Sequence, residues 1–170
     1  VGDPMAPDVD MGALISAPHL EKVLDYVRIG VDEGATLATG GNRVHPQGFE
    51  NGYFMEPTIL TNCRDDMRVV REEIFGPVLS VIGFDTADEA VAIANDSIYG
   101  LAAAVWTSNI NTAHKVAKAL RAGSVWINHY DGGDMTAPFG GFKQSGNGRD
   151  KSVHAFDKYT ELKATWLVLE

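Results

Sequence analysis

The stretch between residues 78 and 128 alternates between apolar runs and amphipathic segments. The first run, residues 78–84, is almost continuously apolar, which is typical of a strand covered on both faces. Thr86 and Glu89 form the pattern of a capping box for a helix that ends near Asn95, and Asn109 begins a second helical pattern. Strand-like segments at 101–106 and 124–128 follow the two helices. This order predicts an α/β fold: an open parallel sheet with flanking helices and right-handed crossovers.

The residues before this stretch predict one helix and two strands. An apolar stripe at helical spacing, with Pro18 near its start and Gly34 beyond its end, predicts a helix over about 20–31. Segments 35–39 and 54–60 are strand candidates, and Pro57 places the second at a sheet edge. We found neither an internal repeat nor a low-complexity segment.

Charge and cysteine content limit the possible partners. Fourteen basic against 23 acidic residues give a net charge of −9, which argues against nucleic acid or an anionic membrane and suits a cationic substrate better. No apolar run approaches the ~18 residues of a spanning helix, and no signal pattern begins the chain, so we expect a cytoplasmic protein. Cys63 is the only cysteine, and the acids beside it oppose a thiolate, so we interpret it as structural and predict no metal site.

Residues 72–77, Glu-Glu-Ile-Phe-Gly-Pro, combine paired carboxylates, an aromatic residue and a Gly-Pro stop. A carboxylate can accept two hydrogen bonds from a vicinal diol such as a ribose, and an aromatic two positions on offers a flat face to a planar ring. The residues alone allow a second interpretation, a charged turn that precedes a buried strand.

The loop from 128 to 141 follows a predicted strand, at the edge of the sheet where ligands gather in folds of this kind. It holds aromatic residues, two acids and several glycines, which fit a pocket wall and a flexible surface loop equally well. His129 is a candidate base, although a neutral wall residue fits better without a nucleophile nearby. Lys143, Ser145 and Arg149 fit either an anion cradle or a glycine-rich turn.

Residues 163–169 alternate enough to form a strand and carry Trp166 and Leu167 near the end of the chain. An exposed apolar strand at a chain end tends to pair with another strand. We therefore predict a sheet between subunits and a homo-oligomer.

Four motifs occur in this chain in a characteristic order and spacing: EEIFGPV at 72–78, YGLAAAVWT at 99–107, AGSVWIN at 122–128 and PFGGFKQSGNGR at 138–149. Together they resemble the carboxyl-terminal third of the NAD(P)-dependent aldehyde dehydrogenase superfamily, over essentially the whole chain. The loop HYDGGDMTAPFGG and the NDS before YGL resemble γ-glutamyl-γ-aminobutyraldehyde and related aminoaldehyde dehydrogenases, including those similar to betaine aldehyde dehydrogenases.

The resemblance implies roles for individual residues and for the cofactor, which is NAD, with NADP possible. Glu73 matches the glutamate that binds the nicotinamide ribose, and Phe75 matches the aromatic beside the nicotinamide. Phe139 matches an aromatic of the substrate tunnel, and Asn128 belongs to the same wall. The loop that holds the distal end of the aldehyde corresponds to Tyr130, Asp131 and Asp134. Since both acids are negative, we expect an amine-bearing aldehyde, against the alternative that they only shape the turn. The terminal strand resembles the family's oligomerisation strand, which implies a dimer or tetramer.

The resemblance also implies what the chain lacks. The family's catalytic cysteine lies upstream in a Gly-Gln-x-Cys context that Cys63 does not share, and the dinucleotide-binding domain is upstream too. Because the chain begins at Val1 without an initiator Met, we expect a fragment: 1–150 as the carboxyl-terminal part of the catalytic domain, and 151–170 as linker and oligomerisation strand. Such a fragment would not oxidise aldehydes by itself, and no residue of it is expected to be catalytic. The alternative is a non-catalytic binding or assembly module with the same fold.

Overall fold

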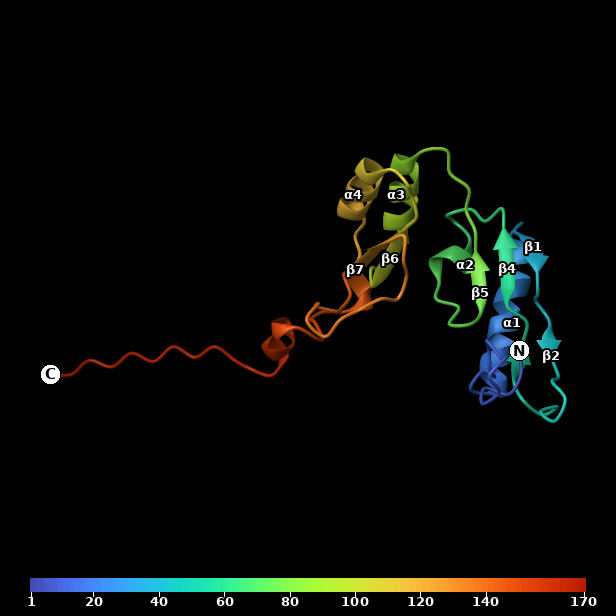
Figure 1. The fold of residues 1–170 in the computed structure, drawn as a ribbon, viewed down its shortest axis with the longest axis horizontal. Coiled ribbons are helices and arrows are strands. Elements are labelled where there is room, and N and C mark those ends of the chain that lie inside the picture. Colours follow the sequence, from blue (N-terminus) through green and yellow to red (C-terminus); the bar gives the residue numbers. More distant parts are fainter. The chain divides into compact units, whose positions relative to one another are not determined.

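The computed structural model describes residues 1–170 as two compact units, Val1–Gly83 and Phe84–Glu170 (Figure 1). Each unit combines helices with short strands, so the α/β class is confirmed. The strands form three sheets: β1, β4 and β5 in one, β2 and β3 in another, and β6 and β7 in the third.

The first unit is built around one long helix and a three-stranded sheet. In chain order its elements are α1 (Ala17–Asp32), β1 (Thr36–Thr39), β2 (Arg43–Val44), β3 (Phe54–Met55), β4 (Thr58–Thr61), α2 (Arg68–Arg71) and β5 (Val78–Ser80). Strand β4 lies in the centre, antiparallel to β1 and parallel to β5. Pro57 separates β3 from β4, but the prediction that this segment lies at a sheet edge is wrong for β4, which pairs with strands on both sides. Pro57 lies just before β4, so it removes no hydrogen bond from the pairing of that strand.

Helix α1 begins and ends where its local signals predict. The Ser16 side chain accepts a hydrogen bond from the His19 amide, and Gly34 adopts a left-handed φ of +102° just past the helix end. Gly30 allows close packing, because a Cβ there would lie 2.8 Å from the Leu60 Cδ1. The absence of a side chain thus brings α1 against β4.

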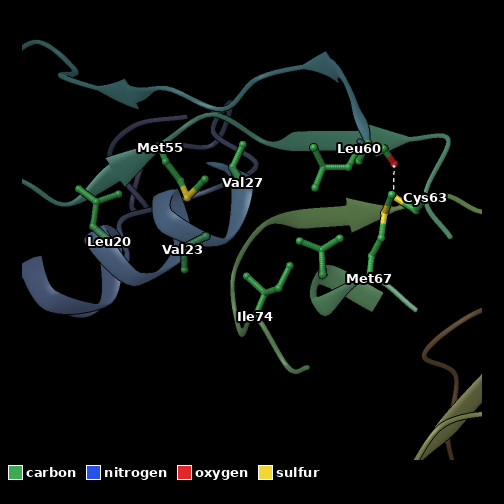
Figure 2. Packing of buried hydrophobic residues seen from close by; sticks show 10 residues of the cluster. Leu20, Val23, Val27, Met55, Leu60, Cys63, Met67 and Ile74 are labelled. Atoms are coloured by element: carbon green, nitrogen blue, oxygen red, sulfur yellow. Dashed lines mark hydrogen bonds between the residues drawn. The ribbon is translucent and has the colours of Figure 1, made fainter. Parts of the chain in front are cut away.

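The core of the first unit forms where α1 meets the strands and α2 (Figure 2). Leu20, Val23 and Val27 share the buried face of α1, and Met55 and Leu60 face them from β3 and β4. Burial of each such side chain contributes roughly 1.5–3 kcal/mol.

Cys63 belongs to this core, because only 5% of it is exposed and its Sγ–H donates to the Leu60 carbonyl at 3.5 Å. Its interpretation as a structural cysteine is confirmed.

The second unit contains two helix–strand pairs followed by loops and two short 3₁₀ segments. Its elements are α3 (Ala87–Asn95), β6 (Ala102–Val105), α4 (Ile110–Ala119), β7 (Ser124–Ile127), η1 (Lys143–Ser145) and η2 (Val153–Lys158). Strands β6 and β7 pair in parallel, with Ala102 opposite Ser124. Helix α4 begins at the predicted Asn109 cap and buries Ala113 and Val116.

Helix α3 has the predicted cap, since the Thr86 hydroxyl accepts from the Glu89 amide. The Glu89 carboxylate returns to the amide of Asp85 instead of that of Thr86. No residue of α3 is fully buried, and Ala94 is exposed.

Two predictions about strand β5 are wrong. The strand ends at Ser80 instead of Phe84, and Leu79 is 58% exposed, so it is not covered on both faces. Within the first unit, strand β5 pairs in parallel with β4. An apolar run indicates that a strand prefers burial. It does not indicate which other elements cover the strand, because those elements lie elsewhere in the sequence.

Residues 160–170 form no helix or strand within this chain, and Trp166 is 92% exposed. Pairing with another subunit involves a second chain, so the intersubunit strand stays a prediction. No helix has both the length and the apolar character needed to cross a membrane.

Candidate functional site

Residues 72–77 follow helix α2 and contain both buried and exposed side chains. Glu72 is the extended C-cap residue of α2, and Ile74 is buried in the core with 7% of its surface exposed. Glu73 and Phe75, on either side of Ile74, are both exposed, Phe75 to 70%. The buried Ile74 thus leaves the two predicted cofactor residues on the surface of one segment.

Glu72 fixes the beginning of this segment. Its carboxylate accepts two hydrogen bonds from the Arg68 guanidinium, each 2.9 Å, and a third of 2.6 Å from the Tyr26 hydroxyl. These bonds lower the pKa of Glu72 to about 2, with Arg68 the larger cause, and the bond to Glu72 raises the pKa of Tyr26. Glu72 therefore ties the segment to α1 and α2.

Gly76 and Pro77 fix the other end. A Cβ at Gly76 would lie 2.7 Å from both methyl carbons of Val23, so only glycine lets the backbone approach α1 this closely. The Pro77 carbonyl accepts a 2.8 Å hydrogen bond from the amide of Thr58, the first residue of β4. The exposed pair therefore stands between two anchored ends.

The Glu73 carboxylate makes no hydrogen bond or ion pair within the chain, whereas its backbone carbonyl accepts from the Lys22 Nζ at 3.5 Å. Phe75 adopts a left-handed φ of +57°, and its carbonyl lies 2.6 Å from the His19 Nε2. A free carboxylate and an exposed aromatic face can bind a vicinal diol and a planar ring. Sequence reasoning missed His19 and Lys22, whose contacts here join residues more than 50 positions apart.

The second unit contains a cleft of about 630 Å³ beside β7. Three of the five predicted substrate residues line it: Asp131, Asp134 and Phe139. Trp126 of β7 and Lys151 also line it, and sequence reasoning missed both. Trp126 lay within a recognised motif but was counted only as part of a strand.

Contacts with Trp126 shape the loop at the cleft. The indole N–H donates to the Gly132 carbonyl at 2.5 Å, and the Tyr130 ring lies 5.3 Å from the indole, centroid to centroid. Tyr130 does not line the cleft itself but packs on Trp126, which does. His129 crowds the same turn, since a Cβ at Gly132 would lie 2.2 Å from its Nε2.

The two acids of the loop differ in their hydrogen bonding. The Asp134 carboxylate accepts from the Thr136 hydroxyl at 2.6 Å and from the Thr136 amide at 2.7 Å, which lowers the pKa of Asp134. Asp131 has a left-handed φ of +59°, and its carboxylate has no partner in the chain. The Lys151 Nζ lies 5.7 Å from the centre of the Phe139 ring, so the cleft also holds a cation.

Asn128 uses its side chain to join two strand ends. Its Oδ1 accepts from the Thr107 amide at 2.8 Å, and its Nδ2 donates to the Thr107 carbonyl at 2.9 Å. Asn128 does not line the cleft. Its contacts within this chain are structural, and its predicted role in the substrate wall stays a prediction.

The candidate anion cradle binds backbone instead. Lys143 donates to the carbonyls of Asn95 and Ser97, both at 2.8 Å, and the Ser145 hydroxyl accepts from the Gly100 amide at 2.9 Å. Arg149 donates to the Gly141 carbonyl at 3.0 Å. These bonds favour the glycine-rich turn over the anion cradle.

Comparison with known proteins identifies the family of this chain. The model of the Aldehyde dehydrogenase family matches residues 1–165. The chain belongs to the aldehyde dehydrogenase family. It is 48% identical over 167 residues to the betaine aldehyde dehydrogenase of Mesorhizobium japonicum, covering 98% of this chain and 34% of that protein.

Two solved aldehyde dehydrogenases share this fold. An indole-3-acetaldehyde dehydrogenase in complex with NAD⁺ is 60% identical with a TM-score of 0.91, covering 99% of this chain and 34% of that one. The aldehyde dehydrogenase KauB from Pseudomonas aeruginosa is 62% identical with the same TM-score and the same two coverages. The chain therefore spans about a third of the length of the relatives it matches.

Proposed function

We propose that this chain supplies part of the cofactor and substrate sites of an NAD-dependent aldehyde dehydrogenase, which oxidises an aldehyde to its carboxylic acid. Membership of the family supports the reaction class, and the NAD⁺ complex of the indole-3-acetaldehyde dehydrogenase supports the cofactor. When bound, the nicotinamide accepts a hydride from the substrate. NADP is the alternative cofactor, and rates measured with each dinucleotide distinguish them.

The observation that carries the proposal is the unpartnered Glu73 carboxylate beside the exposed Phe75 on an anchored segment. Glu73 would accept hydrogen bonds from the hydroxyls of the nicotinamide ribose, and Phe75 would contact the nicotinamide. Neither side chain needs to break a contact within the chain to do so. Because the backbone is already anchored, binding has to order only the two exposed side chains, at a cost of about 0.5–1.5 kcal/mol each.

Steady-state kinetics of the gene product that contains residues 1–170 test this assignment. Glu73→Gln should raise the KM for NAD by about 10- to 100-fold, since a charged hydrogen bond contributes ~1.5–3 kcal/mol. Glu21→Gln on the exposed surface of α1 makes the same change in charge and is the matched control. Equal KM values for the two variants would contradict the role of Glu73.

For the substrate, we propose an aldehyde that carries an amine or a quaternary ammonium group. The free carboxylate of Asp131 in the cleft supports this, with the aromatic rings of Phe139 and Tyr130 close by. The similar protein from Mesorhizobium japonicum is a betaine aldehyde dehydrogenase. Asp134 is a weaker candidate because Thr136 already binds it, and Lys151 opposes a second cation. A role for Asn128 in the substrate wall of the whole enzyme is part of the same proposal.

Two matched variants of the gene product test the substrate proposal. Asp131→Asn should lower kcat/KM for an aminoaldehyde up to about fivefold, the range of an exposed ion pair, and leave a neutral aldehyde unaffected. Asp134→Asn should change this preference less. If the ratio of the two kcat/KM values stays the same in both variants, the loop does not select a cationic substrate.

We further propose that residues 1–170 alone do not oxidise aldehydes, because their only cysteine is buried in the core. In this proposal residues 1–150 belong to the catalytic domain and 151–170 to the linker and oligomerisation strand. NADH formation by the purified chain above that of a Glu73→Gln variant would contradict it. A non-catalytic module is the alternative, which is favoured if the gene product also forms no NADH.

Oligomerisation to a dimer or tetramer through residues 163–169 is part of the same proposal. Its support is the exposed apolar surface of Trp166 and Leu167. A monomeric gene product in light scattering would contradict it. A cytoplasmic location is proposed from the lone buried thiol and is tested by cell fractionation.

A further inference from the structure

His19 lies in the first turn of α1, where its ring meets Phe75. The two ring centroids are 6.1 Å apart, and the His19 Nε2 lies 2.6 Å from the Phe75 carbonyl oxygen. The other ring nitrogen, Nδ1, is buried and has no hydrogen-bond partner. It is the only buried side-chain nitrogen or oxygen in the chain without one.

This pattern selects one tautomer of the ring. A carbonyl oxygen only accepts hydrogen bonds, so the 2.6 Å contact requires a proton on Nε2. A proton on Nδ1 would find no acceptor. The arrangement that satisfies the single N–H of a neutral imidazole is therefore Nε2–H donating to Phe75.

Phe75 needs such support because its backbone is in a region that bulky residues avoid. Its φ of +57° brings Cβ against the following carbonyl. Residues with this conformation persist where their surroundings fix them. Ile74 is buried before it and Gly76 packs on Val23 after it, but neither contact holds the carbonyl of Phe75.

We propose that His19 is a positioning residue: its Nε2–H holds the Phe75 carbonyl, and thereby keeps Phe75 left-handed with its ring presented to solvent. The functional consequence rests on the proposed function, in which that ring contacts the nicotinamide. Without the hydrogen bond, the backbone of Phe75 relaxes to a right-handed or extended conformation, and its ring no longer keeps its present orientation toward solvent. His19 does not itself touch the reacting atoms.

Backbone NMR of the isotopically labelled 170-residue chain tests the positioning. The coupling between the amide and α protons of Phe75, together with its ¹³C shifts, reports φ at that residue. His19→Gln can place an N–H near the position of Nε2 and should keep the left-handed values. His19→Ala, and His19→Phe, which keeps a ring but has no donor, should both lose them.

A second measurement needs no variant. The ¹⁵N shifts of the His19 ring in the wild-type chain should show a protonated Nε2 and an unprotonated Nδ1. The reverse tautomer would overturn the proposal, as would left-handed values for Phe75 in the alanine variant. Unchanged amide shifts of Val23 and Leu60 establish that each variant keeps its core.

Kinetics of the gene product then separate this inference from the proposed function. The complete proposal is supported if His19→Ala loses the left-handed conformation of Phe75 and has a higher KM for NAD, whereas His19→Gln keeps the conformation and the KM of the wild type. If the conformation changes and the KM does not, the positioning role stands and the contact between Phe75 and the nicotinamide is overturned.

Discussion

Glu72 and Glu73 are neighbours in sequence, but their side chains have opposite surroundings. The Glu72 carboxylate accepts three hydrogen bonds from Arg68 and Tyr26, whereas the Glu73 carboxylate accepts none. Because the backbone is extended here, one carboxylate faces the helices and the next faces solvent. The pair thus combines an anchor with a free binding group.

The anchor predicts an acid-dependent loss of stability. The folded-state pKa of Glu72, about 2, lies below its ordinary value of 4.5, so its contribution is complete above pH 4.5 and is lost as the pH falls toward 2. Between these values the urea midpoint should fall more for the wild-type chain than for Glu72→Gln. Parallel pH profiles for the two proteins would contradict the role of Arg68 and Tyr26.

The close packing of Gly76 on α1 predicts a loss of stability on substitution that does not depend on pH. An added Cβ would lie 2.7 Å from the methyl carbons of Val23, so Gly76→Ala should lower the free energy of unfolding by about 1–3 kcal/mol. Gly83→Ala is the control, because a Cβ there meets nothing within 4 Å. Urea titrations monitored by circular dichroism compare the two, and similar midpoints would show that the segment does not pack tightly on α1.

At the scale of elements, local sequence signals set where each helix begins. In both α3 and α4, the side chain of the N-cap residue accepts a hydrogen bond from the backbone amide three residues later. Thr86→Ala should therefore destabilise the second unit by about 0.5–2 kcal/mol, and Thr86→Ser should restore most of the loss. Thermal unfolding measures this, and an alanine variant as stable as wild type would show that the cap contributes nothing.

The distance in sequence between contacting residues explains which predictions succeeded. Helices α1, α3 and α4 were predicted because their caps and apolar stripes lie within a few residues of one another. The exposure of β5 and the anchoring of Glu72 were not, because the first depends on pairing between strands and the second on Tyr26, 46 residues away. The motifs identified Glu73 and Phe75 as candidates, but not the His19 contact that accompanies the strained backbone of Phe75.

At the scale of the whole molecule, the candidate residues divide between two compact units. Glu73 and Phe75 belong to the first, and the cleft with Asp131, Asp134 and Phe139 belongs to the second. Each unit holds its candidate side chains with contacts of its own, through Glu72 and Gly76 in one and Trp126 in the other. The variants of each group should therefore have separable effects, on the KM for NAD and on the choice of aldehyde.

The central claim is that Glu73 and Phe75 form a wall of the dinucleotide site, and a crystal structure of the gene product with NAD tests it most directly. We predict that the Glu73 carboxylate lies within hydrogen-bond distance of the nicotinamide ribose hydroxyls, about 2.5–3.0 Å, with the Phe75 ring against the nicotinamide. A bound NAD whose ribose and nicotinamide contact neither residue would contradict the claim.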